Sequence, residues 1–200
     1  MKSIFTLLCS ALLATSLAAT AAESTPDTLV KAVTDDVLNV IRTTKDKRQL
    51  RDAAEQKVLP HFDFRAMTQL AVGRYWREAT PAQQKSLEEA FRTLLVNTYT
   101  SALSVAATGK ESVEVKPAEN KGGNDALVRT VIRAPGKQPI AADYRMANGA
   151  DGWKVYDVIV ENLSLVTNYR STFATEIQKS GIDGLVKTLE NKNRELAQSN

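Results

Sequence analysis

The sequence has a single cysteine, Cys9, and a single histidine, His61. Cys9 lies inside a short apolar stretch near the N-terminus, so the rest of the chain can form neither a disulfide nor a thiol nucleophile. His61 has no cysteine and no suitably spaced carboxylates with which to bind zinc. We therefore expect no metal site and no cofactor, and a fold that depends on its core alone.

The chain also has no glycine-rich phosphate loop and no serine nucleophile elbow. Its 26 basic and 23 acidic residues give a net charge of +3. Removal of Lys2 with the N-terminal stretch would leave +2. Basic and acidic residues are interleaved, whereas nucleic acids are bound by dense basic surfaces. Nucleic acid is therefore not an expected partner.

Residues 1–22 have the pattern of a secretory signal peptide. Lys2 gives a basic start, Ile4 to Leu17 is apolar apart from small polar residues, and Ala19-Thr20-Ala21 is a small-x-small cleavage site. No later stretch approaches the roughly twenty apolar residues needed to span a membrane. We expect cleavage, export, and a soluble mature chain of residues 23–200 that forms one domain.

The first half of the mature chain predicts helices. Thr25-Pro26 pairs an N-cap residue with a proline at the first helical position, and Asp63 can cap a short helix. Thr80-Pro81-Ala82-Gln83 has the pattern of a capping box. We expect four helices, near residues 26–43, 47–58, 64–73 and 81–104.

After Gly109 the period changes from helical to alternating. Four strands are predicted at residues 112–116, 126–133, 140–146 and 153–160, and turn residues separate them. This spacing is typical of a meandering antiparallel sheet with one apolar face and one polar face. The apolar face should carry alternate residues of the second and third strands: Val128, Thr130, Ile132, Ile140, Ala142, Tyr144 and Met146.

The fourth strand leads almost directly into a helix. Glu161-Asn162 forms the corner, since asparagine tolerates a left-handed backbone. A helix is expected from Leu163 to Ser180, a last helix after Gly181, and a frayed tail after Asn191. The predicted fold class is α+β: a curved four-stranded antiparallel meander wrapped by about six helices, shaped as a cone that is open at one end.

A set of short motifs extends along the mature chain: Tyr75-Trp76, Ala79-Thr80-Pro81-Ala82-Gln83, Ala90-Phe91-Arg92, Trp153, Tyr156-Asp157-Val158, Glu161, Ser164, Lys179 and Gly181-Ile182-Asp183-Gly184-Leu185. In these motifs and their order the chain resembles the MlaC family of periplasmic phospholipid carriers, also called toluene-tolerance proteins. The one departure that we note is Asn162, where the family commonly has glycine.

The resemblance implies an NTF2-like cone whose apolar cavity encloses the acyl chains of a glycerophospholipid, with the head group at the mouth. It also implies a periplasmic carrier that exchanges lipid with an outer-membrane lipoprotein complex and with an inner-membrane ABC transporter of the Mla pathway. The resemblance further implies that this activity would maintain the lipid asymmetry of the outer membrane. We expect a monomer without enzymatic activity, whose only ligand is its lipid cargo.

A carrier of this kind needs an apolar wall with few polar contacts. Each residue that we assign to the wall also fits an ordinary core position. Ala142 is the most informative, because a small residue on an inward face leaves room for a ligand. The predicted lipid-binding wall consists of Leu94, Leu95, Tyr99, Val128, Ile132, Ala142, Tyr144, Val158, Val166 and Tyr169.

Asp157 interrupts the most apolar strand, where an unpaired carboxylate would be costly. We expect it to face outward or to pair with Arg129, Arg133 or Arg145. In the alternative interpretation the cone is a small-molecule enzyme in which Asp143, Tyr144 and Asp157 serve as base and oxyanion donor. A third possibility is a periplasmic adaptor whose own side chains fill the cavity.

Three basic residues, Arg74, Arg77 and Lys85, are candidates for contact with a head-group phosphate or an acidic partner. A solvated helix face explains them equally well. His61 is expected to be a structural or surface residue.

Overall fold

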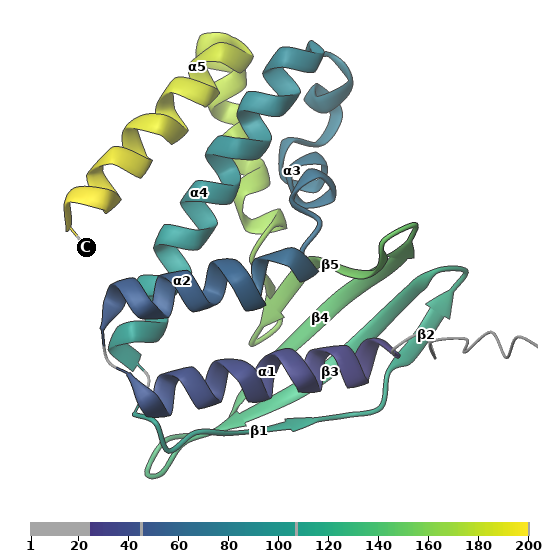
Figure 1. Cartoon of the computed structure of the whole chain (residues 1–200). Helices are drawn as coiled ribbons and strands as arrows, with labels where there is room; N and C mark the ends of the chain where they lie inside the picture. Colours follow the sequence, from purple (N-terminus) through teal and green to yellow (C-terminus); the bar gives the residue numbers. More distant parts are fainter. Residues whose placement is uncertain (1–24, 45, 107, 200) are drawn as a thin grey trace, which may run out of the picture.

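A computed structural model describes residues 25–44, 46–106 and 108–199 (Figure 1). The predicted signal peptide lies outside the described residues. Within them the chain forms five α-helices and an antiparallel sheet of six strands, which confirms the α+β class but not the expected four strands. None of these helices is long and apolar enough to cross a bilayer.

The N-terminal helices begin where their capping residues predict. The side chain of Asp63 accepts a hydrogen bond from the Ala66 N–H at 2.8 Å, whereas Thr25 makes no side-chain cap. The capping box is formed, since Thr80 and Gln83 each accept a hydrogen bond from the other's backbone N–H. The elements are α1 (Pro26–Thr43), α2 (Lys47–Lys57), η1 (Leu59–His61), α3 (Phe64–Val72), η2 (Gly73–Arg77) and α4 (Pro81–Ala106).

The sheet follows the predicted meander but has two additional short strands, β2 and β6. Both β1 and β2 pair with β3, and Pro117 lies between them, where a proline cannot donate to the ladder. Both additional strands are too short to show a clear period of two. The strands are β1 (Ser112–Val115), β2 (Glu119–Gly122), β3 (Asp125–Arg133), β4 (Ile140–Gly149), β5 (Gly152–Val160) and β6 (Leu163–Ser164).

The pairing of β3, β4 and β5 places the predicted apolar residues on one face. Val128 lies opposite Tyr144, which lies opposite Val158. A β-bulge then shifts the register, because Arg145 pairs with Asp157 while Met146 pairs with Val155. The bulge therefore turns Val155 and Val158 to the same face although they are three residues apart.

The corner after β5 is left-handed as predicted, with φ of 49° at Glu161 and 66° at Asn162. Positive φ at both central residues is the signature of a tight two-residue hairpin turn. The chain accordingly returns as β6, with Leu163 opposite Val160. The expected helix start at Leu163 is therefore wrong, and the helical chain begins with η3 (Thr167–Tyr169) and α5 (Arg170–Ser199).

Helix α5 bends sharply at Gly181, where φ is 74° and ψ is 179°. The two predicted C-terminal helices are the two halves of this element. Its second half packs back on α4, and the Asn193 side chain donates to the Ala90 carbonyl at 2.8 Å. The predicted fraying after Asn191 is wrong, because this packing holds the helix as far as Ser199.

Two apolar clusters lie between these layers. The sheet cluster has Val30, Val128, Met146 and Val155 at its centre, under α1 (Figure 1). The helical cluster is formed by α3, α4 and α5. Phe62 packs against both clusters, and the N–H of the next residue, Asp63, donates to the Val155 carbonyl at 2.8 Å. The connection between η1 and α3 thus joins the helices to β5.

The bend in α5 generates a first prediction. The backbone at Gly181 occupies a region that is almost exclusive to glycine, although an added Cβ would meet no atom within 4 Å. Gly181→Ala should therefore lower the free energy of unfolding by about 1–3 kcal/mol, as measured by urea denaturation. Gly149→Ala is the control, because this glycine has no positive φ and equally open space. Equal effects of the two substitutions would contradict the prediction.

Candidate functional site

The apolar face of the sheet contains three of the predicted wall residues within one cluster. Val128 is fully buried, and Tyr144 and Val158 pack half-buried against it in the sheet cluster. The neighbouring Thr130 is also buried, and its hydroxyl donates to the Ala142 carbonyl at 2.6 Å. Even the polar residue on this face is therefore satisfied internally.

Five other predicted wall residues lie in the helical cluster. Leu94 and Leu95 of α4 and Val166 before η3 are buried there. Tyr99 of α4 and Tyr169 of η3 lie half-buried at the edge of the cluster. The structure thus divides the predicted wall between the helices and the sheet.

Ala142 and Ile132 belong to neither cluster. They lie on the same face of the sheet, near the end formed by the β5–β6 turn and the β3–β4 connection. Ile140, opposite Ile132, is 42% exposed, and Leu163, opposite Val160, is 54% exposed. Ile140 and Leu163 are not among the ten wall residues that the sequence predicts. The alternation in β4 could have identified Ile140, but Leu163 was assigned to a helix.

The tyrosines of this region remain uncharged at ordinary pH. Burial, together with the adjacent hydroxyl of Tyr169, raises the pKa of Tyr99 to about 12. Burial also raises the pKa values of Tyr144 and Tyr169. Because the other wall residues are aliphatic, the candidate wall contains no ionised side chain.

Asp157 is fully buried on the opposite side of β5. Its carboxylate accepts hydrogen bonds from the Ser164 hydroxyl, with distances of 2.7 and 2.9 Å to the two oxygens. The Val166 N–H lies 3.4 Å from Oδ1, and Arg145 is the basic partner, at 4.0 Å. The prediction that Asp157 pairs with a basic residue is confirmed, and its main effect is to hold β6 against β5.

The residues of the alternative enzyme interpretation do not converge. Asp143 and Tyr144 are adjacent in β4 and therefore point to opposite faces. Asp143 lies 3.7 Å from Arg129, and Asp157 is enclosed beneath β6 without access to a substrate. His61 is half-buried, and burial and the charge of Lys154 lower its pKa. The described residues contain no cluster of metal-binding side chains around it or elsewhere.

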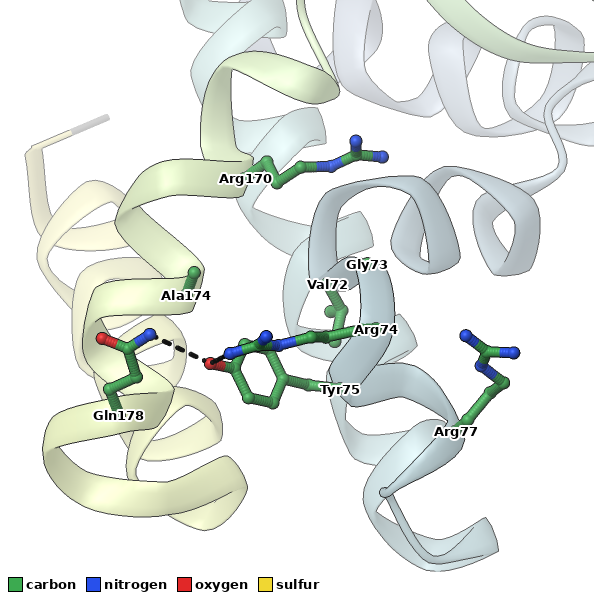
Figure 2. A pocket seen from close by; sticks show the side chains of 8 residues that line it. All are labelled: Val72, Gly73, Arg74, Tyr75, Arg77, Arg170, Ala174 and Gln178. Carbon is green, nitrogen blue, oxygen red and sulfur yellow. Dashed lines mark hydrogen bonds between the residues drawn. The ribbon is translucent and has the colours of Figure 1, made fainter.

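Two of the three basic candidates lie together. Arg74 and Arg77 line a cleft of about 480 Å³ between η2 and α5 (Figure 2). Lys85 instead lies on α4, 3.8 Å from Glu89. Arg170 also lines this cleft, which could not be predicted because it is about a hundred residues away in the sequence. We call it the arginine cleft, and its lining residues are Val72, Gly73, Arg74, Tyr75, Arg77, Arg170, Ala174 and Gln178.

Comparison with known sequences identifies a family and two relatives that this chain resembles. Residues 31–191 match the family described as MlaC protein. The toluene tolerance protein ttg2D of Pseudomonas putida is 27% identical over 186 residues, covering 90% of this chain and 85% of that protein. The intermembrane phospholipid transport system binding protein MlaC of Haemophilus influenzae is 24% identical over 200 residues, covering 95% and 92% of the two chains.

A solved structure shares the fold. The phospholipid-binding protein from Ralstonia solanacearum, determined in complex with a phospholipid, matches with a TM-score of 0.78 and 35% sequence identity. The match covers 87% of this chain and 99% of that one.

The buried carboxylate generates a second prediction. Asp157→Asn should lower the free energy of unfolding by about 1–3 kcal/mol in urea denaturation, because it removes a buried acceptor that Ser164 and Val166 contact. Asp143→Asn is the matched control. Its carboxylate is partly exposed and only loosely paired, so the cost should stay below about 1 kcal/mol. Similar losses for both variants would show that the contact with Ser164 does not stabilise the fold.

Proposed function

The chain belongs to the MlaC family, and from this premise we propose that it is a periplasmic carrier of glycerophospholipids. The observation that carries the proposal is the match, at 35% identity and over most of both chains, to a protein solved with a bound phospholipid. The carrier would enclose the acyl chains and pass the lipid between membrane complexes. Its activity would be transport, without chemical conversion of the lipid.

The physical requirement for such a carrier is a neutral apolar surface. Burial of one methylene is worth roughly 0.8 kcal/mol, so one chain of about sixteen carbons gains on the order of 12 kcal/mol in gross transfer energy. A carrier must replace nearly all of this contact, yet must not bind so tightly that it cannot release the lipid. Aliphatic side chains and uncharged tyrosines meet both demands.

We propose that the acyl chains contact the ten wall residues between the helical cluster and the sheet. The half-buried members still have apolar surface that a ligand could cover: Tyr99, Ile132, Tyr144, Val158 and Tyr169. Ile140 and Leu163 extend this surface to the end of the sheet, where we place the mouth. The buried members would support the wall or move apart when lipid enters.

The remaining parts of the proposal concern the setting of the carrier. Residues 1–22 would be removed as a signal peptide, and residues 23–200 would form a single phospholipid-binding domain that acts as a monomer. Its partners would be the outer-membrane lipoprotein complex and the inner-membrane ABC transporter of the Mla pathway, and it would not bind nucleic acid. Bound phospholipid would be cargo, with no cofactor.

The first test is native mass spectrometry of the mature protein purified from the periplasm without detergent. We expect added masses that organic extraction identifies as diacyl phospholipids. The Asp157→Asn variant should retain this lipid in the molecules that remain folded, because its side chain is fully buried and is not one of the ten wall residues. A folded protein that carries no lipid would overturn the proposal.

A matched pair of substitutions tests the wall. Ala142→Trp places an indole on the inward face and should reduce the bound phospholipid on the order of tenfold, since the loss of about two methylene contacts costs that much. Ala141→Trp is the control, because this neighbour is exposed on the other face of β4. Quantitative lipid extraction gives the result, and circular dichroism verifies that both variants fold. Unchanged lipid in a folded Ala142→Trp variant would contradict the wall assignment.

A further inference from the structure

The arginine cleft is separate from the predicted wall. Phe173 and Ile177 of α5 are buried in the helical cluster, whereas Arg170, Ala174 and Gln178 form a stripe along another side of the same helix and line the cleft. No residue of the predicted wall lines it. The cleft therefore lies beside the helical cluster, since Val72 and Tyr75 belong to that cluster and Ala174 packs against it.

Arg170 is fixed by hydrogen bonds that use only some of its N–H donors. Its Nε and Nη2 both donate to the Leu70 carbonyl, at 2.9 and 2.7 Å. Leu70 lies in the last turn of α3, where free carbonyls carry partial negative charge. Gly73, with φ of 64°, turns the chain here, and its Cα faces the Arg170 side chain. A guanidinium has five N–H donors, so three remain for a ligand.

The opposite wall of the cleft is equally organised. The Arg74 guanidinium lies over the Tyr75 ring, 4.8 Å from its centroid, and donates to the Tyr75 hydroxyl at 2.9 Å. Gln178 donates to the same oxygen at 3.1 Å (Figure 2). The hydrogen bonds from Arg74 and Gln178 lower the pKa of Tyr75 from its ordinary value. A more acidic hydroxyl is a better donor.

Two donors of the cleft have no partner. The Tyr75 hydroxyl accepts twice, but its own O–H has no acceptor among the residues that the structure describes. Arg77, at the rim, makes no hydrogen bond or ion pair to the described part of the chain (Figure 2). No carboxylate lines the cleft, and the nearby Glu78, which acts on the charge of Arg74, leaves the cleft with an excess of positive charge from its three guanidinium groups.

We propose that the arginine cleft binds the phosphodiester head group of a phospholipid, an inference that rests on the proposed function. The donors approach from two walls, which suits the tetrahedral oxygens of a phosphate better than a planar carboxylate. The space of about 480 Å³ exceeds what a single carboxylate fills, and Val72 and Ala174 offer apolar contact for the glycerol backbone. The head group would come from a lipid at a membrane surface or, if the mouth of the cavity lies at this cleft and not at the end of the sheet, from the carried lipid.

The test is an NMR titration of the delipidated mature protein with glycerophosphoglycerol, followed through the arginine Nε–H signals and the backbone amides of η2. We expect saturable shifts at Arg74, Arg170 and Tyr75. The double substitution Arg74→Gln with Arg77→Gln should weaken binding at least about tenfold, because it removes two of the three charges. Tyr75→Phe should also weaken binding, since it removes the unpartnered hydroxyl donor together with the oxygen that Arg74 and Gln178 contact.

The control is Arg48→Gln, an exposed arginine of α2 outside the cleft, which should bind as the parent protein does. If the phosphodiester also gives saturable shifts with lipid-loaded protein, the head group that the cleft binds comes from a lipid at a membrane surface. If loading the protein with lipid abolishes these shifts, the head group is that of the carried lipid. Shifts caused by a tetraglutamate peptide but not by the phosphodiester would overturn the proposal in favour of an acidic protein partner. The absence of shifts with either probe would also overturn it. Native mass spectrometry would still detect bound lipid, so the proposed function is judged separately.

Discussion

The buried carboxylate of Asp157 is the interaction on which the arrangement of sheet and helices depends. It holds Ser164, and through Ser164 the two-residue strand β6, against the last long strand. The Ser164 hydroxyl oxygen also accepts from the Thr167 N–H at 3.0 Å, which fixes the start of η3. The next turns bring Val166, Tyr169 and Phe173 onto α4, where the rings of Tyr169 and Phe173 each lie 5.2 Å from that of Phe91. A charged group outside the wall thus positions an uncharged wall.

This separation of charge from the wall agrees with the energetics of lipid transport. A carboxylate or guanidinium exposed to acyl chains would lose hydration without gaining a partner. Charged residues of β3 and β4 therefore pair on the outer face, as Arg129 does with Asp143 and, more closely, with Glu119. The inner face is left to aliphatic side chains, neutral tyrosines and the internally satisfied Thr130.

Helix α5 has two surfaces with different chemistry. One stripe packs aromatic and aliphatic residues into the helical cluster, and the next stripe lines the arginine cleft. Both depend on the same contacts with α3 and α4, so a change in the packing of α5 would alter the cleft and the wall together.

Local signals in the sequence determined much of this structure. The capping box at Thr80, the cap at Asp63, the left-handed corner at Asn162 and the alternation in β3 and β4 each depend on a few neighbouring residues, and each is found in the structure. Tertiary structure alone decided the rest. Strand β6 exists because Asp157 and β5 hold two residues that have helical periodicity, and the bulge at Tyr156 has no counterpart in the alternation pattern. The cleft brings Arg170 to Arg74 across about a hundred residues, because the packing of α5 against α3 sets that distance and sequence spacing does not.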